Sequence, residues 1–372
     1  MKNSQIKVCH MTSVHKRYDA RILKKECCTL VANGYDVTLI VADNKPEENY
    51  NGVKIVSSNF KPKNRLDRII NLKKYIFAKA IEINADIYHF HDPELIPVGL
   101  DLLKRGKKVI YDCHEDYEED IKDKSWIPHF LRPFVAYIFK CYERHSAKYF
   151  NIIITVTPSI VEKFERYHDN VYMVTNYPII HTKQTDAIKQ PQICFTGLIS
   201  PLWCQEVIVS ALNLLNDPIK YVIAGPASED YLNTLRNLDV KGNMFYLGYL
   251  SSDDVDKVQR SSLAGLAVLR YCRAVGGNLG TLGNNKLFEY MSAGIPVICT
   301  DFVLWKNIID KWKCGICVCP QDPTQVASAI TFLLKNPDIA YSMGESGRKA
   351  VESEFNWDTQ ATILLEAYRS IK

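Results

Sequence analysis

The feature that most constrains the fold is a regular alternation of short apolar runs with longer amphipathic segments. In the first half of the chain, seven runs have the length and composition of buried strands: Ile6–His10, Val37–Val41, Val53–Ser57, Ile87–Phe90, Val109–Tyr111, Ile152–Val156 and Val171–Val174. Four segments between them have helical periodicity: Leu23–Asn33, Leu66–Ile83, Leu95–Arg105 and Phe130–Tyr149. Strands that alternate with helices predict a parallel sheet with helices on both faces.

The second half of the chain repeats this pattern. A polar, aperiodic segment, His181–Gln190, separates the halves and is predicted to be a linker. Six further strands are expected: Ile193–Thr196, Tyr221–Ala224, Met244–Leu247, Leu263–Leu269, Val297–Thr300 and Ile316–Cys319. We therefore expect an α/β protein with two doubly wound, Rossmann-like domains, residues 1–180 and 191–352, that face a central cleft. Ligands of such sheets bind beyond the carboxyl ends of the strands.

Composition and charge exclude several classes of protein. The chain has 47% hydrophobic and 24% charged residues and a net charge of +4, which does not favour a nucleic-acid partner. Its first residues, MKNSQIKVCH, lack a signal-peptide pattern, and no run approaches the ~18 apolar residues of a membrane span. Twelve cysteines in such a chain are expected to be free thiols in a reducing compartment, so we predict a cytoplasmic protein. The segment Cys314–Cys319 is better explained as a strand than as a metal site.

One segment combines local structure with candidate chemistry. Asn284–Thr300, NNKLFEYMSAGIPVICT, is typical of a helix followed by a buried strand, and Asn284 and Asn285 are favourable N-cap residues. Lys286 and Glu289 are one turn apart and point the same way. A cation in the first turn of a helix, with a carboxylate beside it, suits a phosphate and a sugar hydroxyl. A simple surface ion pair is the alternative.

The same segment carries a family resemblance. NKLFEYMSAGIPVI, CGICVCPQDPTQVASAI, GESGRKAV and FNWDTQATILLEAY resemble the C-terminal half of family 4 glycosyltransferases (glycosyltransferase group 1) of the GT-B fold, in a bacterial branch with the NKLFEYM motif. TSVHKRYDARILKKE, YHFHDPELIPVGL and KKVIYDCHEDY resemble the N-terminal half. The resemblance implies a retaining, metal-independent enzyme that moves a sugar from a nucleotide-diphosphate sugar to a glycan or lipid-linked acceptor in bacterial surface polysaccharide synthesis. It implies no further cofactor.

The resemblance also assigns the domains. The N-terminal domain would take the acceptor, the C-terminal domain the donor, and the last helix, residues 358–371, would cross back to the first domain. The implied donor-binding residues are Gly197, Gly225, Arg270, Gly283, Asn284, Asn285, Lys286, Leu287 and Glu289.

Three departures from the family pattern sharpen the donor assignment. Many relatives have Arg and Lys where this chain has Leu198 and Trp203, and a glutamate where it has Thr281. Lys286 is therefore the expected phosphate cation, with Arg270 as the second candidate. Glu289 is expected to accept hydrogen bonds from the ribose hydroxyls.

On the acceptor side, polar residues follow three strands that are predicted to be neighbours. The resemblance makes His114 the first candidate to contact the transferred sugar or acceptor, because relatives have a histidine in this role after the same strand, and with Lys286 and Glu289 it completes the predicted catalytic set. The other acceptor-side candidates are His15, Asp19, Arg21, His91, Asp92 and Glu115. Histidines and carboxylates at neighbouring strand ends also suggest a metal site. Because the resemblance is to metal-independent enzymes, we expect no metal, and we discount the Asp-x-Asp pattern at Asp254 and Asp256 for its place at a helix start.

The segment Lys61–Lys79 has seven basic residues, one acidic residue and an apolar stripe that includes Leu66, Ile69, Ile70 and Ile76. A basic amphipathic helix can lie on an anionic membrane, such as the inner face of the cytoplasmic membrane. The alternative is a helix that packs its stripe on the sheet.

Two other functions stay open. A nucleotide-sugar 2-epimerase of the same fold would need no acceptor. A transferase-like subunit that binds a nucleotide sugar without catalysis would explain the departures at Leu198, Trp203 and Thr281. A dehydrogenase is disfavoured, since no G-x-G-x-x-G follows the first strand of either half.

Overall fold

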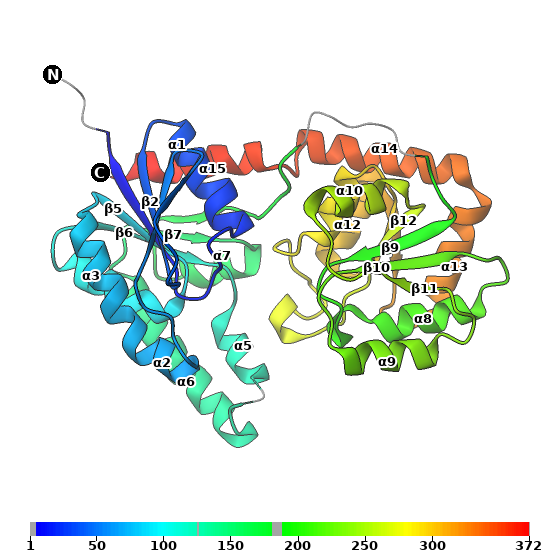
Figure 1. Ribbon diagram of the computed structural model, residues 1–372, viewed down its shortest axis with the longest axis horizontal. Helices are drawn as coiled ribbons and strands as arrows, with labels where there is room; N and C mark the ends of the chain where they lie inside the picture. The colour runs from blue at the N-terminus through cyan, green and yellow to red at the C-terminus, as the bar shows by residue number, and fades with distance from the viewer. Residues whose placement is uncertain (1–4, 125, 181–187, 372) are drawn as a thin grey trace. The chain divides into compact units, whose positions relative to one another are not determined.

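A computed structural model describes residues 5–124, 126–180 and 188–371. The chain forms two compact units (Figure 1). The N-terminal unit comprises Met1–Asn176 and Trp357–Lys372, and the C-terminal unit comprises Tyr177–Asn356. The division thus falls between Asn176 and Tyr177. Of the predicted linker, residues 181–187 lie outside the described part of the chain.

The N-terminal unit is built on an eight-stranded sheet with the order β3-β4-β2-β1-β5-β6-β7-β8. Its strands are β1 (Lys7–Met11), β2 (Asp36–Val41), β3 (Glu48–Tyr50), β4 (Val53–Ser57), β5 (Ile87–Phe90), β6 (Lys108–Cys113), β7 (Ile152–Thr155) and β8 (Val171–Met173). Seven of them match the predicted runs to within two residues and pair in parallel, whereas the unpredicted edge strand β3 pairs antiparallel with β4. Its three residues, Glu-Asn-Tyr, lack the apolar run that marks the others.

Helical segments connect these strands. They are η1 (a π-helix, Ala20–Cys27), α1 (Cys28–Ala32), α2 (Arg65–Asp67), η2 (a π-helix, Arg68–Leu72), α3 (Lys73–Ile83), η3 (Pro93–Leu95), α4 (Ile96–Leu103), α5 (Tyr117–Asp123), η4 (His129–Leu131), α6 (Arg132–Ala147), α7 (Pro158–Glu165) and α15 (Trp357–Ser370). Residues from η1, α1 and α15 fill the core on one face of the sheet. Residues from α3, α4 and α7 fill the core on the other face.

The C-terminal unit has a six-stranded parallel sheet with the order β11-β10-β9-β12-β13-β14, which is the strand order of a Rossmann fold. Its strands are β9 (Gln192–Thr196), β10 (Lys220–Ala224), β11 (Met244–Tyr246), β12 (Ala264–Ala267), β13 (Val297–Thr300) and β14 (Gly315–Val318). Its helices are η5 (Pro201–Trp203), α8 (Gln205–Leu214), α9 (Glu229–Leu238), α10 (Ser252–Ser261), η6 (Arg273–Val275), α11 (Lys286–Ser292), α12 (Val303–Trp312), α13 (Pro323–Lys335) and α14 (Pro337–Ser353). The α/β class and the two parallel-sheet domains are confirmed.

Two local predictions need correction. The helix predicted at Leu23–Asn33 starts earlier, at Ala20, and its first part is a π-helix, in which Lys24 N–H donates to the carbonyl of Asp19 five residues before. The single amphipathic helix predicted within Lys61–Lys79 is divided into α2, η2 and α3. Its apolar stripe divides as well, because Ile76 is buried while Leu66 is 68% exposed.

Within the described ranges, no helix is both long enough and apolar enough to span a bilayer.

Candidate active site

In the C-terminal unit, packing fixes the start of helix α11 beside the first strand of the sheet. The Tyr290 ring covers Gly265 on β12, where any Cβ atom would collide with it. The Tyr290 hydroxyl accepts a hydrogen bond of 3.2 Å from the backbone N–H of Thr196, the last residue of β9. Leu287, one of the predicted donor-binding residues, is fully buried. Its side chain therefore anchors the helix start in the core.

Lys286 and Glu289 form the predicted pair at the exposed side of this helix start. The Lys286 ammonium lies 2.7 Å from Glu289 Oε2, and both side chains are partly accessible. The Lys286 side chain also crosses over Gly197, the residue that follows β9. A Cβ atom at Gly197 would lie 2.7 Å from Lys286 Cε. The cation therefore sits at the carboxyl end of the first Rossmann strand, where ligands of such sheets bind.

The two strand-end glycines allow the backbone to approach closely. Gly197 and Gly225 have φ angles of +152° and +135°, which favour glycine, and a Cβ atom at Gly225 would collide with the carbonyl oxygen of Gly197. Their N–H groups already donate to the carbonyls of Ala224 and Gly248, at 2.8 Å each. The glycines thus provide space for a ligand, while their own N–H groups are engaged within the sheet.

The departures from the family pattern have a clear structural basis. Trp203 is 7% exposed and packs against Phe195 in the core, so this position offers no room for a cation. Leu198 is exposed. Thr281 accepts a hydrogen bond of 3.0 Å from the N–H of Gly283 and so shapes the loop before α11. Lys286 stands alone among these positions as a positive charge.

The asparagines before α11 differ from their predicted capping role. Asn285 occupies the N-cap position, but its side chain makes no capping bond, and its buried Oδ1 has no hydrogen-bond partner. Asn284 Oδ1 lies 3.5 Å from the backbone nitrogen of Lys286, at the limit of a hydrogen bond.

Arg270, the second candidate for the phosphate cation, lines a hollow of about 410 Å³. The residues around that hollow are Cys204, Glu206, Val207, Arg270, Pro320 and Gln321.

In the N-terminal unit, Asp92 fastens the loop that follows β1. Its Oδ2 accepts hydrogen bonds from the hydroxyl of Thr12 at 2.7 Å and from the N–H of Ser13 at 2.6 Å. Asp92 is almost fully buried. Its role is to hold the loop that carries His15 and Asp19.

Asp19 and His15 form an ion pair above this loop. Asp19 caps η1 by accepting from the N–H groups of Arg21 and Ile22, and its Oδ2 lies 3.2 Å from His15 Nδ1. Burial raises the pKa of Asp19, but the hydrogen bonds from His15 and Ile22 outweigh it and hold that pKa well below its usual value. Burial lowers the pKa of His15, but the hydrogen bond to Asp19 and the charge of Asp92 outweigh it, so the pKa is raised.

His114 lies at the edge of a buried polar network. Its Nε2 is 2.9 Å from Asp112 Oδ2 and 3.2 Å from Arg21 Nε. The Arg21 guanidinium also binds both oxygens of Asp112 and lies 2.9 Å from Glu26 Oε1. Among the acceptor-side candidates, only His15, Asp19, Glu115 and part of His114 reach the surface, whereas Arg21, His91 and Asp92 are buried beneath them.

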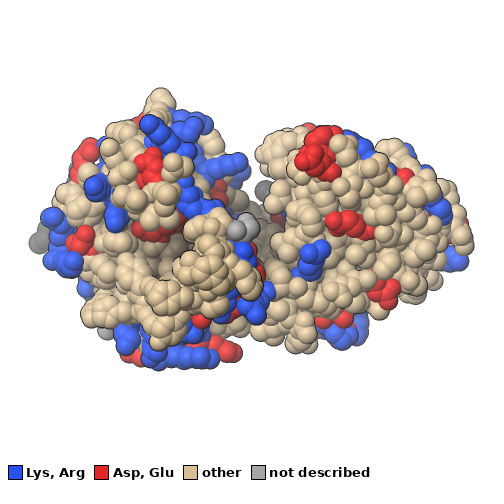
Figure 2. Space-filling view, turned by 90° about the horizontal axis from the view of Figure 1, so that it is seen from below, with Lys and Arg blue, Asp and Glu red and all other residues tan. Residues whose placement is uncertain are grey.

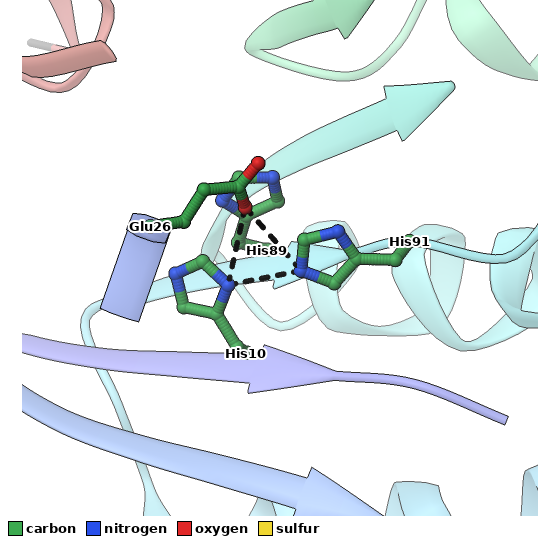
Figure 3. Close-up of side chains that lie close together, drawn as sticks. All are labelled: His10, Glu26, His89 and His91. Carbon is green, nitrogen blue, oxygen red and sulfur yellow. Dashed lines mark hydrogen bonds and ion pairs between the residues drawn. The ribbon is translucent and has the colours of Figure 1, made fainter. Parts of the chain in front are cut away.

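The sequence-based prediction missed four further members of the network. They are His10, Glu26, His89 and Asp112, all fully buried. They belong to β1, η1, β5 and β6, and Figure 3 shows three of them with His91. The sequence nevertheless contained a feature that could have revealed them, namely polar residues within apolar strands. His10 and His89 are directly paired in the sheet, and a polar residue inside a strand predicted to be buried on both faces marks a polar core.

Burial sets the protonation of this network. It lowers the pKa of His10 and of His91 well below the usual value for histidine, and the neighbouring His89 lowers both further. Burial raises the pKa of Glu26 well above its usual value. For Asp112, burial is outweighed by the charge of Arg21 and by His114, and the pKa is held well below its usual value.

The Asp-x-Asp pattern is explained by helix α10. Ser251 Oγ accepts from the N–H of Asp254, whose carboxylate binds Lys257 at 2.8 Å. Asp256 binds Arg260 through two hydrogen bonds of 2.7 and 2.8 Å. Both carboxylates thus serve a helix start and its exposed face.

Comparison with known families accounts for both units. The model "Glycosyl transferases group 1" matches residues 178–350, and the model "Glycosyltransferase Family 4" matches residues 20–177. The chain belongs to these glycosyltransferase families. A curated relative, the GDP-mannose-dependent α-(1-6)-phosphatidylinositol monomannoside mannosyltransferase of Mycobacterium tuberculosis, is 29% identical over 185 residues. That match covers 48% of this chain and 46%, or about half, of the relative.

Solved structures identify the fold of this family member as GT-B. Sucrose-phosphate synthase from Thermosynechococcus elongatus superposes with a TM-score of 0.76 at 13% identity and covers 98% of both chains. HepE from Anabaena, in complex with UDP and glucose, superposes with a TM-score of 0.73 at 13% identity and covers 98% of this chain and 100% of its own. At these identities the likeness concerns the fold.

Proposed function

We propose that the chain is a nucleotide-sugar-dependent glycosyltransferase that binds its donor in the C-terminal unit and acts with retention of configuration. The observation that supports this most is the position of Lys286, whose side chain crosses Gly197 at the end of β9 and meets Glu289 one turn along α11. Related and similar proteins are described as GDP-mannose-dependent or are bound to UDP and glucose. A nucleoside diphosphate is therefore the leaving group that we assign to this site.

Lys286 would supply the charge that the departing diphosphate needs. Its ammonium has three donors, so the bond of 2.7 Å to Glu289 leaves two of them for phosphate oxygens. Fixed donors aimed at developing negative charge lower the barrier of a transfer reaction. In this proposal Lys286 takes the part that a metal ion plays in metal-dependent transferases, and the donor site works without one. Glu289 accepts hydrogen bonds from the ribose hydroxyls.

The transfer step itself uses the leaving group. The bond between the sugar C1 and the diphosphate oxygen breaks, and the acceptor oxygen bonds to C1 on the same face. The acceptor proton passes to the departing phosphate oxygen, so no protein carboxylate acts as a nucleophile. We assign to His114, in the N-terminal unit, the contact with the transferred sugar or the acceptor. Its Nε2 lies 2.9 Å from Asp112 Oδ2 and 3.2 Å from Arg21 Nε, and these two contacts orient the ring.

The proposed acceptor is a glycan or a lipid-linked sugar in bacterial surface polysaccharide synthesis. The Mycobacterium relative is described as acting on phosphatidylinositol monomannoside, which supports a lipid-linked class. We further propose a cytoplasmic protein that docks on the inner face of the cytoplasmic membrane through its N-terminal unit.

An exposed basic and apolar surface of the N-terminal unit supports membrane docking. Its apolar members extend over α2, η2, the loop before η4, η4 itself and α6, and are Leu66, Ile69, Ile70, Trp126, Phe130, Phe134 and Tyr137. Phe130 is 79% exposed. The Arg65 guanidinium lies 4.6 Å from the Trp126 ring, which joins the two parts of this surface. Figure 2 shows uncharged surface on this unit bordered by Lys and Arg side chains, an arrangement that suits anionic headgroups.

The membrane contact is tested by vesicle sedimentation. Lys73→Glu with Lys74→Glu should weaken binding to phosphatidylserine vesicles at least about 30-fold, since each basic residue near the surface contributes about 1 kcal/mol. Lys335→Glu with Lys349→Glu, on exposed residues of the C-terminal unit, is the matched control. The contact would be refuted if the Lys73→Glu, Lys74→Glu variant bound vesicles as the wild type does, or if the control variant lost binding to the same extent.

The activity is tested by incubating the purified chain with a panel of UDP- and GDP-sugars, with and without glycan acceptors. We expect one sugar nucleotide to release its nucleoside diphosphate, slowly with water and faster with an acceptor. Formation of an isomeric sugar nucleotide would instead identify a 2-epimerase. Binding of a sugar nucleotide without any turnover would identify the non-catalytic subunit.

A further inference from the structure

Three ligand-type atoms converge in the core of the N-terminal unit, on the face of the sheet covered by η1 and α15. They are His10 Nδ1, His91 Nε2 and Glu26 Oε2, and their side chains are fully buried (Figure 3). The two nitrogens are 2.9 Å apart, and the carboxylate oxygen lies 3.9 Å from His10 and 3.8 Å from His91. Three different elements, β1, η1 and the residue after β5, supply them.

The triangle has the size of a metal site. The point equidistant from its three corners lies about 2.1 Å from each atom, as the three edge lengths dictate. Zinc bonds to histidine nitrogen at about 2.0–2.1 Å and to carboxylate oxygen at about 2.0–2.2 Å. His89 offers a further nitrogen, and the ligand-type atoms of all four residues lie within 4.8 Å of one another.

In His10 and His91, the ring nitrogen that is not part of the triangle has a polar partner, as expected for a histidine that binds a metal. The Tyr368 hydroxyl lies 3.1 Å from His10 Nε2 and 2.8 Å from His89 Nδ1, and His91 Nδ1 lies 3.4 Å from Asp112 Oδ2. When His10 Nε2 and His91 Nδ1 hold the ring protons for these contacts, the two inner nitrogens face each other with lone pairs. Lone pairs 2.9 Å apart repel each other unless a cation lies between them.

The network contains more carboxyl groups than cationic side chains. Glu26 and Asp112 bring two carboxyl groups, and Arg21 brings one guanidinium. Arg21 pairs with Oε1 of Glu26, with Nε at 2.9 Å, whereas Oε2 faces the histidines without a hydrogen-bond partner among the described residues. Metal-bound histidines typically donate their outer N–H to a carboxylate or another polar group, as Asp112 and Tyr368 would accept here.

We propose that His10, His91 and Glu26 bind one zinc-class divalent ion in the core of the N-terminal unit. The ion would tie β1, η1 and β5 together directly below the loops that carry His15 and His114. It would be structural, and Lys286 would remain the cation of the donor site. The inference stands independently of the proposed transfer activity.

The first test uses the wild-type chain, purified without a polyhistidine tag, so that no variant needs to fold. Elemental analysis should find about one zinc per chain. The metal-depleted chain should take up one equivalent of Co²⁺ and develop the visible ligand-field absorption of a tetrahedral site, which Zn²⁺ then abolishes. A chain that retains no metal and shows no such absorption with excess Co²⁺ would overturn the proposal, because protons alone would then bridge the histidines.

Two variants separate this site from adventitious binding. Tyr368→Phe removes only the hydroxyl that orients His10 and His89, and should weaken Co²⁺ binding about 10-fold. His145→Asn, at an exposed histidine of α6, is the matched control and should leave Co²⁺ binding unchanged. A Co²⁺ signal that persists unaltered in Tyr368→Phe but falls in His145→Asn would place the metal on the surface and refute the buried site.

Discussion

In the C-terminal unit the candidate donor site consists of one helix start and one strand-end loop, whereas the N-terminal unit assembles its polar network from β1, η1, β5, β6 and α15. Lys286 and Glu289 are three residues apart and partly accessible. His10, Glu26, Asp112 and Tyr368 are far apart in the sequence and buried. The donor site of neighbouring residues keeps its Lys–Glu pair although the family's other cations are replaced by Leu198 and Trp203. In the buried network, by contrast, we expect the stability of the fold to depend on every member.

The largest expected effect is on stability and comes from the buried network. Arg21→Met leaves Glu26 and Asp112 without their guanidinium, and removal of one partner from a buried ion pair costs about 3–5 kcal/mol. Chemical denaturation should measure this loss. Arg236→Met removes an exposed pair with Glu229 and should cost less than about 1 kcal/mol. Equal effects of the two changes would abolish the contrast between network and surface.

A smaller effect separates catalysis from donor binding. His114→Ala should lower the transfer rate about 100-fold or more, within the range of a lost proton-transfer or orienting group. Its affinity for nucleoside diphosphate should stay unchanged, because His114 belongs to the N-terminal unit. Steady-state kinetics and calorimetry on the same preparation test this. A parallel loss of nucleotide affinity would show that His114 contacts the donor.

The ribose contact gives a difference of about tenfold. Glu289→Gln should weaken binding of a ribonucleoside diphosphate by about 1.4 kcal/mol, because a charge-assisted hydrogen bond is lost. The deoxyribose analogue should be affected much less. Direct titration of both nucleotides against both proteins measures the difference. If the two nucleotides lose affinity equally, Glu289 acts on the phosphates through Lys286 rather than on the ribose.

The smallest effect concerns the surface pair of His15 with Asp19, 3.2 Å apart. Because the pKa of His15 is raised in the folded state, the pair stabilises the fold fully below the pKa of unfolded histidine, about 6.5. This contribution, less than about 1 kcal/mol, is lost as the pH rises through the folded pKa. The difference in unfolding free energy between the wild type and His15→Gln should therefore shrink with rising pH. A constant difference would mean that the pair does not titrate.

The same contrast explains how much could be predicted from the sequence. Both parallel sheets and nearly all strands followed from local apolar runs, because a strand buried on both faces needs such a run. The pair Lys286–Glu289 followed from helical spacing. The polar network did not, since its members meet only through strand order and register. The π-helix of η1 also brings Arg21 and Glu26, five residues apart, within 2.9 Å of each other, which an α-helical pattern would not predict.

The capping prediction failed for a different reason. Asn285 has the right residue type for an N-cap, but it adopts helical backbone angles, φ −77° and ψ −21°, so its side chain makes no capping bond to the first turn. Its Oδ1 is left without a partner beside the proposed donor site. Residue type predicted the start of the helix, whereas tertiary packing determined its geometry.

The central claim, that Lys286 is the cation for the donor diphosphate, is tested most directly by calorimetry with nucleoside diphosphate. Lys286→Met should weaken binding by roughly 10- to 100-fold, since hydrogen bonds to charged groups contribute about 1.5–3 kcal/mol, and should affect the nucleoside alone far less. Arg270→Met, at the hollow lined by Cys204 and Pro320, is the matched control and should leave affinity unchanged. Wild-type affinity in Lys286→Met, with a loss in Arg270→Met, would contradict the account and move the phosphate site to Arg270.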